Sequence, residues 1–267
     1  MRALCRRYRV TPAGFYAWSR RGVSAHAEQD RLLTHQITAL FVTHEQRYGS
    51  PRIHQLLRSA AVIVSRRRVA RLMREAGLCA KAVRGYRAKA SIHRRYAQHP
   101  NRVWTTRVTR PNQVWVGDIT YLRVARGWRY LAVVMDQYSR RVLAWSLSAR
   151  RTAAVTCAVL SRAARQRAAP GLIFHSDRGS EYMGTRFCTH VARLGLLQSA
   201  SRRGPGDNSH MESFFHSLKA ELTRGVAFPT DAVLRTALRR YLRYYNTTRL
   251  HSALAYHSPI AFERHAA

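Results

Sequence analysis

Hydrophobic residues in the first third of the chain recur every three or four positions, which is the period of helices with one buried face. This spacing predicts a helix over residues 28–43. Ser50 and Ser65 precede two further helical stretches, and serine is a favoured residue at the start of a helix. Gly77 is placed to end the second stretch. Thr11–Pro12 is a typical helix start and predicts another short helix near the N-terminus.

From Val114 onward, short apolar segments separated by turns replace the helical spacing. Strands are predicted over residues 114–122, 130–136, 141–147, 172–176 and 196–199. The short connections between the first three are typical of an antiparallel meander. Helices are predicted over residues 152–168, 185–194 and 230–245, the last capped by Thr230 or Asp231. Strands that then alternate with helices indicate an α/β fold with a sheet of mixed direction.

These patterns divide the chain into five segments. They are an N-terminal helical segment (1–43), a helix-turn-helix-like region (44–80), a basic linker (81–112), a sheet domain (113–225) and a C-terminal helical extension (226–267). The second segment is expected to be all-α, because two short helices joined by a tight turn resemble a helix-turn-helix. The linker is rich in arginine and lysine, and little in it could be buried.

Charge gives the first indication of function. The 267 residues include 47 Lys and Arg against 13 Asp and Glu, a net charge of +34, and the excess is almost all arginine. Arginine pairs with phosphate through two donors, so nucleic acid is the expected partner. The helix after Ser65 presents Arg66, Arg67, Arg71 and Arg74 outward, and we expect these four to contact DNA. The alternative is a helical hairpin whose arginines are only solvated.

Several other classes of protein are disfavoured by composition. The four cysteines lie far apart and form no CxxC pair, which argues against a zinc ribbon or disulfide framework and fits a reducing compartment. No apolar run approaches the roughly 20 residues of a membrane span. The charged N-terminus has no apolar core after it, so no secretory signal is expected. A cytoplasmic protein without a membrane partner is predicted.

Three of the rare acids are candidates for a shared site. Asp118 lies within the first predicted strand and Asp177 at the end of the fourth. If these strands are neighbours, the two side chains converge, and Glu212 lies on a helix that could pack across the sheet. Converging carboxylates need a cation between them, and oxygen ligands favour Mg²⁺, with Mn²⁺ as an alternative. Two ions about 3.5–4 Å apart would clamp the oxygens of a phosphodiester displacement.

Other polar residues are expected around these acids. Asn208, Glu212 and Lys219 share one helix face, so Lys219 is predicted to hold a DNA phosphate. Asn208 either supports the site or simply caps its helix. Alternation places His175 on the same face as Asp177, as a supporting residue.

Two further residues each have two candidate roles. A local turn role is favoured for Glu181, with a position near the site as the alternative. The segment around Arg249, near the C-terminus, is expected mainly to support the fold, with contact of Arg249 to DNA as the further candidate role.

Four motifs carry a resemblance to one family. They are Trp115–Tyr121 (WVGDITY), His175–Ser180 (HSDRGS), Asp207–Lys219 (DNSHMESFFHSLK) and Tyr245–Leu254 (YNTTRLHSAL). Together they resemble the OrfB-type transposase of the IS-three group of bacterial insertion sequences, whose core is similar to retroviral integrase. Residues 44–77 resemble the family's helix-turn-helix segment and residues 111–265 its catalytic core.

The resemblance implies an RNase H-like fold with a five-stranded mixed sheet and flanking helices. It also implies an Asp-Asp-Glu triad of Asp118, Asp177 and Glu212, and Mg²⁺-dependent cleavage and joining of DNA ends. A homo-oligomer on DNA, an OrfA partner protein or frameshift fusion, and a nucleoid-associated location in the bacterial cytoplasm follow as expectations. Residues 178–211 separate Asp177 from Glu212, one fewer than the family usually has, and the loss falls in residues 203–208.

Two alternatives to a transposase remain at this stage. One is a catalytically inactive DNA-binding remnant or regulator of the same family, which would bind element ends without cutting them. The other is an RNase H-type nuclease, against which the basic helix-turn-helix-like region argues.

Overall fold

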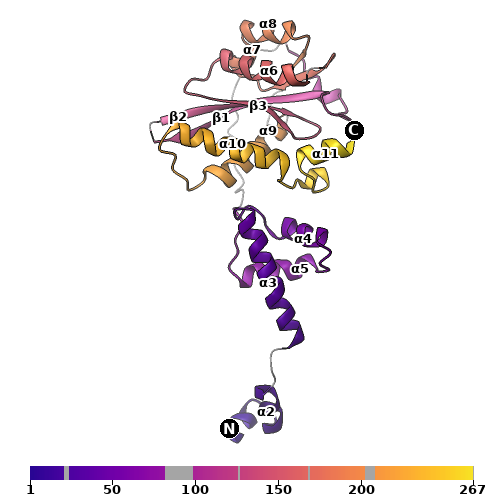
Figure 1. The fold of residues 1–267 in the computed structure, drawn as a ribbon, viewed down its shortest axis with the longest axis vertical. Helices are drawn as coiled ribbons and strands as arrows, with labels where there is room; N and C mark the ends of the chain where they lie inside the picture. Colours follow the sequence, from indigo (N-terminus) through magenta and orange to yellow (C-terminus); the bar gives the residue numbers. More distant parts are fainter. Residues whose placement is uncertain (21–23, 82–98, 126, 168, 202–207, 267) are drawn as a thin grey trace. The chain divides into compact units, whose positions relative to one another are not determined.

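The computed structural model describes residues 1–20, 24–81, 99–125, 127–167, 169–201 and 208–266 (Figure 1). The chain forms two units, Met1–Lys81 and Ala82–Ala267.

The N-terminal unit is all-α, as expected. Its helices are α1 (Arg2–Arg7), α2 (Pro12–Arg20), α3 (Ala25–Thr43), α4 (Ser50–Ser59) and α5 (Arg66–Glu75). The predicted starts at Thr11 and Ser65 are confirmed, since each side chain accepts a hydrogen bond from a backbone N–H three residues on. Ser50 is instead the first residue of α4, and Gly49 occupies the N-cap position. The helix boundary therefore differs from the prediction by one residue.

Helices α3, α4 and α5 share one core. Their inward faces bury Leu33, Ile37, Phe41, Ile53, Leu57, Val69, Leu72 and Met73. An ion-pair cluster also joins α5 to α3: Asp30 accepts hydrogen bonds from Arg68 Nε at 2.7 Å and Arg71 Nη2 at 2.6 Å. The helix-turn-helix-like pair is thus buttressed by the long helix before it.

The C-terminal unit is built on a five-stranded mixed sheet. Its strands are β1 (Val114–Val124), β2 (Gly127–Asp136), β3 (Val142–Ser148), β4 (Ile173–Ser176) and β5 (Leu197–Ala200), in the order β3-β2-β1-β4-β5. β1, β2 and β3 form the predicted antiparallel meander, while β4 runs parallel to β1 and β5. The predicted fold class is confirmed.

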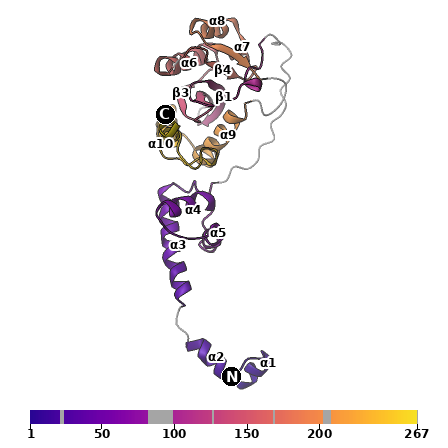
Figure 2. The same cartoon turned by 90° about the vertical axis from the view of Figure 1, so that its right-hand side faces the viewer.

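Helices cover both faces of this sheet (Figures 1 and 2). On one face lie α6 (Ala153–Arg167), α7 (Ser180–Met183) and α8 (Thr185–Arg193); on the other lie α9 (Ser209–Leu218), the π-helix η2 (Lys219–Thr223) and α10 (Asp231–Thr247). The remaining elements are η1 (Val103–Thr105), η3 (Ser252–Leu254) and α11 (Pro259–Ala266). Two hydrophobic clusters result, with Val116 in the one on the α10 side and Trp115 in the one on the α6 side.

The described end of the predicted linker packs on the sheet domain. Ser199 Oγ accepts a hydrogen bond from the Arg102 N–H at 2.9 Å, and the Pro100 carbonyl accepts one from the Ala200 N–H. Val103 and Val108 pack against the core. Residues 99–112 therefore belong structurally with β5, while residues 82–98 of the predicted linker lie outside the described residues.

Arg249 is not a surface residue, contrary to its expected role as a DNA contact. It is 4% exposed and forms an ion pair with Glu221, also 4% exposed, with Nη2 and Oε1 2.6 Å apart. Tyr241 donates a further hydrogen bond to Glu221 Oε2 at 3.1 Å. The family motif around Arg249 thus serves to anchor η2 against α10 and η3.

Replacing Arg249 with Met is expected to lower the free energy of unfolding by about 3–5 kcal/mol, because Glu221 would keep a buried charge without its partner. Urea denaturation measures the change. The double variant Arg249→Met/Glu221→Leu is expected to recover part of the loss, whereas Arg239→Met, at an exposed position on α10, should change stability by less than about 0.5 kcal/mol. A small effect of Arg249→Met alone would contradict this role.

Candidate active site

The pairing of β1 with β4 brings Asp118 and Asp177 together. The parallel register matches Gly117 with Ser176, so the next residues along the two chains are the two aspartates. Residues level with one another in a sheet project to the same face. Both side chains are partly buried. The strand adjacency on which the sequence prediction depended is therefore present.

Backbone donors orient both carboxylates. Asp118 Oδ1 accepts a hydrogen bond from the Ile119 N–H at 2.7 Å, and Asp177 Oδ1 accepts one from the Gly179 N–H at 3.0 Å. Burial, and next the negative charge of Asp177, raise the pKa of Asp118 to about 8. Two carboxylates that repel each other in this way form a site to which a cation would be attracted.

Glu181 and Arg151 form a second layer beside the aspartates. Arg151 Nε donates to Glu181 Oε1 at 2.7 Å, and the Glu181 side chain is buried. The charge of Glu181 contributes to raising the pKa of Asp118, whereas the charge of Arg151 opposes the rise. The sequence favoured a local turn role for Glu181 and left a position near the site as the alternative. Arg151 was not identified from the sequence because nothing distinguishes it from the many other arginines.

Helix α9 approaches β1 on both sides of Asp118. At its start, Asn208 Nδ2 donates to the Gly117 carbonyl at 3.2 Å. Asn208 occupies the N-cap position but makes no side-chain capping bond, so it ties the helix to the strand instead. At the other end, Lys219 Nζ lies 4.6 Å from the centre of the Tyr121 ring. Burial lowers the pKa of Lys219, and the nearby charge of Asp118 partly offsets that effect.

Glu212 lies one turn after Asn208 on α9 and is exposed. It shares a helix face with Asn208 and Lys219, both of which reach β1 near Asp118. Among the described residues, no three His, Cys, Asp or Glu side chains are grouped as a metal-ligand set. The structure thus brings the two aspartates together and leaves Glu212 on the adjacent helix. The shortened segment before α9, residues 202–207, lies outside the described residues.

His175 lies in the wall between β5 and α9. It is fully buried, and its Nδ1 is 2.9 Å from Ser199 Oγ. Burial, followed by the charges of Arg140 and His175, lowers the pKa of His210 to about 4. His175 therefore contacts β5, and its charge acts on His210 in the first turn of α9.

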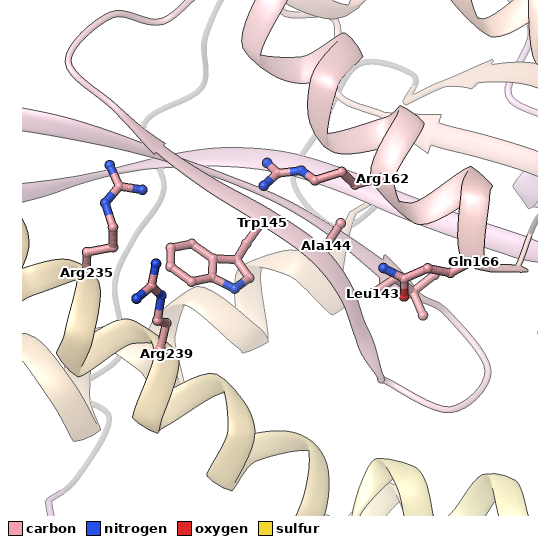
Figure 3. Close-up of a pocket in the computed structure, with 7 residues that line it drawn as sticks. All are labelled: Leu143, Ala144, Trp145, Arg162, Gln166, Arg235 and Arg239. Carbon is pink, nitrogen blue, oxygen red and sulfur yellow. The ribbon is translucent and has the colours of Figure 1, made fainter.

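A cavity of about 340 Å³ lies at the edge strand β3 and is lined by residues of β3, α6 and α10. Figure 3 shows these residues. Trp145 lies in the cavity, with Arg162 on one side and Arg235 and Arg239 on the other. None of the predicted site residues lines it. A smaller cavity, of about 270 Å³, lies beside the start of α9 and is lined by Asn208 and His210.

Comparisons with known proteins agree with this architecture. Models described as integrase core domain match residues 108–205 and 212–266, and one described as HTH-like domain matches residues 28–86. A transposase for insertion sequence element IS904 from Lactococcus lactis subsp. lactis is 38% identical, over 88% of this chain and 94% of its own length. Transposase InsF for insertion sequence IS3A from Escherichia coli is 36% identical, over 98% of this chain and 93% of its own length. The chain belongs to the IS3 family of insertion-sequence transposases.

The family predicted from the four motifs is thereby confirmed, and with it the RNase H-like fold. A chain of the simian T-cell lymphotropic virus intasome, solved in complex with PP2A regulatory subunit B56 gamma, matches with a TM-score of 0.51. It is 17% identical, and the match covers 85% of this transposase and 74% of that chain, so the two share a fold. No helix in the described ranges of the transposase is long and apolar enough to cross a membrane.

Three of the four arginines predicted on α5 are exposed. Arg66, Arg67 and Arg74 face solvent in the transposase. Arg71 pairs with Asp30 and also with Glu75, where Nη1 and Oε2 are 2.9 Å apart. The charge of Arg71 is thus partly neutralised by acids of the same helical unit. Arg66, Arg67 and Arg74 are therefore the better candidates for phosphate contacts.

The pH dependence of stability provides a test of the aspartate pair. Because the folded-state pKa of Asp118 lies above its ordinary value of 3.8, folding favours the protonated form. This contribution is present at low pH and is lost as the pH rises towards about 8. With chelator present, Asp118→Asn should therefore unfold at a higher temperature than the wild type at pH 8, by a margin that shrinks towards pH 5. Asp177→Asn should move the transition of Asp118 to lower pH. A margin that grows on acidification would be the opposite result.

Proposed function

We propose that this transposase cleaves and joins DNA ends by phosphodiester transfer at Asp118, Asp177 and Glu212. The observation that carries the proposal is the pair of aspartates set side by side by the β1–β4 register, with the pKa of Asp118 raised to about 8. Neither Ser-His-Asp nor Cys-His nucleophile chemistry is needed for such a displacement, because water or a DNA 3′-hydroxyl supplies the attacking oxygen.

The donor chemistry of the site fits a divalent cation. Carboxylate oxygens are the ligands that Mg²⁺ and Mn²⁺ prefer, and mutual repulsion between Asp118 and Asp177 would be relieved by a positive charge between them. These two residues, with Glu212 from α9, would hold a pair of Mg²⁺ ions. When bound, the ions would supply Lewis-acid polarisation of the phosphodiester and a lower pKa for the attacking hydroxyl.

The residues of the chain itself position the reactants. The Ile119 and Gly179 N–H groups each hold one carboxylate oxygen, which fixes the orientation of Asp118 and Asp177. Lys219, partly buried and close to Asp118, would steady a phosphate next to the carboxylates. The bond from Asn208 to Gly117 holds the first turn of α9 against β1, so that Glu212 can turn toward the same space.

DNA binding is shared between the two units in this proposal. Arg66, Arg67 and Arg74 on α5 would contact the phosphate backbone, in keeping with the HTH-like match over residues 28–86. Joining requires two element ends to be held together, which favours a homo-oligomer on DNA. An OrfA partner or fusion would supply end recognition, and a DNA substrate in a bacterial cell places the activity in the cytoplasm.

A catalytically inactive DNA-binding protein is the competing candidate. The relatives of this chain are themselves transposases over nearly its full length, which does not favour an inactive remnant. Incubation of the chain with labelled DNA ends and Mg²⁺ separates the two candidates: binding without any cleaved or joined product would support the inactive form.

Asp118→Asn is expected to reduce strand cleavage and joining by at least about a thousandfold, because one carboxylate of the reaction centre is lost. DNA affinity should stay within about twofold, since the affinity comes mainly from phosphate contacts elsewhere. Gel-based strand transfer and filter binding measure the two effects. Asp231→Asn is the matched control, because Asp231 pairs with Arg129 on the same domain. Normal strand transfer by Asp118→Asn would sink the proposal.

The double variant Arg66→Gln/Arg67→Gln is expected to weaken binding to all DNA sequences alike. Each lost phosphate contact should lower the slope of log affinity against log salt by about 0.9. Arg31→Gln is the matched control, because Arg31 on α3 already pairs with Glu28, 2.7 Å away. An unchanged salt slope in the double variant would show that α5 does not contact DNA.

A further inference from the structure

Four side chains beside the candidate active site form what we call the aromatic–cation cluster: Tyr121, Arg123, Trp128 and Lys219. The Tyr121 and Trp128 rings meet edge to face, with their centres 5.1 Å apart. The Arg123 guanidinium lies 5.2 Å from the Trp128 ring centre, and Lys219 Nζ lies 4.6 Å from that of Tyr121. The residues of the cluster come from β1, β2 and η2.

Core packing does not account for these aromatic residues. Tyr121 and Trp128 are 52% and 48% exposed. Along β1, exposed and buried residues alternate: Leu122 and Val124 are buried in the core, while Tyr121 and Arg123 face away from it. Arg123 and Trp128 are directly opposite each other in the antiparallel register. Such pairs add stability to a hairpin, but this one leaves a large aromatic surface in water.

The cluster lies next to the aspartate pair. β4 pairs with β1 only as far as Gly117, so residues 118–124 extend past it and are paired with β2 on one side. Tyr121 follows Asp118 by three residues on this extension. Lys219 links the two features, since it lies over the Tyr121 ring and its charge interacts with that of Asp118.

We propose that the aromatic–cation cluster stacks an unpaired base of the DNA strand that enters the aspartate site. Exposed aromatic rings flanked by cations are the combination with which proteins hold single-stranded nucleic acid, because every base has a face that can stack. The flexible Arg123 and Lys219 side chains, which now lie over the rings, would move to the flanking phosphates. The location of this base beside the reacting phosphate rests on the proposed function; the stacking itself does not.

The test uses the full chain, with chelator, and DNA carrying 2-aminopurine in an unpaired end. Wild-type protein should quench the probe strongly at the unpaired end and weakly within a paired duplex. Tyr121→Ala and Trp128→Ala should abolish the quenching and lower affinity for the unpaired end about tenfold, while affinity for blunt duplex changes less than about twofold. Trp128→Phe, which keeps a ring, should retain most of the effect, and Trp128→Leu, which keeps only apolar bulk, should lose it.

Trp104→Ala is the matched control, because Trp104 is an exposed tryptophan of the same unit and lies outside the cluster. It should leave the quenching unchanged. Equal losses for paired and unpaired DNA, or quenching that survives in both alanine variants, would overturn the proposal. Asp118→Asn should quench as the wild type does. Failure of the active-site assignment would thus appear in strand transfer alone, and failure of the cluster in the fluorescence alone.

Discussion

Parallel pairing between β1 and β4 is the constraint on which the candidate site depends. The register that matches Gly117 with Ser176 sets Asp118 beside Asp177, and a slip of one residue would send the two side chains to opposite faces. β4 ends there while β1 continues, so the carboxylates lie where the sheet loses a strand and opens to one side. The backbone thus brings the two charges together at a place that a substrate can reach.

Packing on both sides of the sheet keeps this arrangement in register. A side chain at Gly117 would overlap the Phe174 ring on β4, so glycine before Asp118 lets the two strands and their aromatic core fit together. On the other side, η2 carries Lys219 toward Tyr121 and Glu221 into the interior, where Arg249 fixes it. A buried ion pair adds little net stability compared with apolar packing. This ion pair fixes Glu221 and so holds η2, the element that also carries Lys219, against Arg249 and Tyr241.

Local patterns predicted the helices and strands well, because helix caps and strand alternation depend only on residues that are close together in sequence. Thr230 caps α10 as expected, and the meander and both aspartates were placed correctly. The buried ion pair of Arg249 was not predicted because its partner Glu221 lies 28 residues away in sequence, and no local pattern connects them. Residues 99–112 were assigned to a linker for the same reason, since their contacts are with β5, about a hundred positions on. In both cases the position of the residues depends on contacts between segments that are far apart in sequence, and local sequence patterns do not reveal such contacts.

The few acids of this basic protein differ in what holds them in place. Most of the described acids form ion pairs with arginine: Glu28, Asp30, Glu45, Glu75, Glu181, Glu221, Asp231 and Glu263. Backbone N–H groups orient Asp118 and Asp177.

The charge of Arg151 lowers the pKa of Asp118, and its guanidinium is paired with buried Glu181. The charge of Arg151 only partly offsets the effects of burial and of Asp177, so the pKa of Asp118 stays raised. Glu181 therefore acts on Asp118 in two ways: its own charge raises the pKa of Asp118, and it binds the arginine whose charge lowers that pKa.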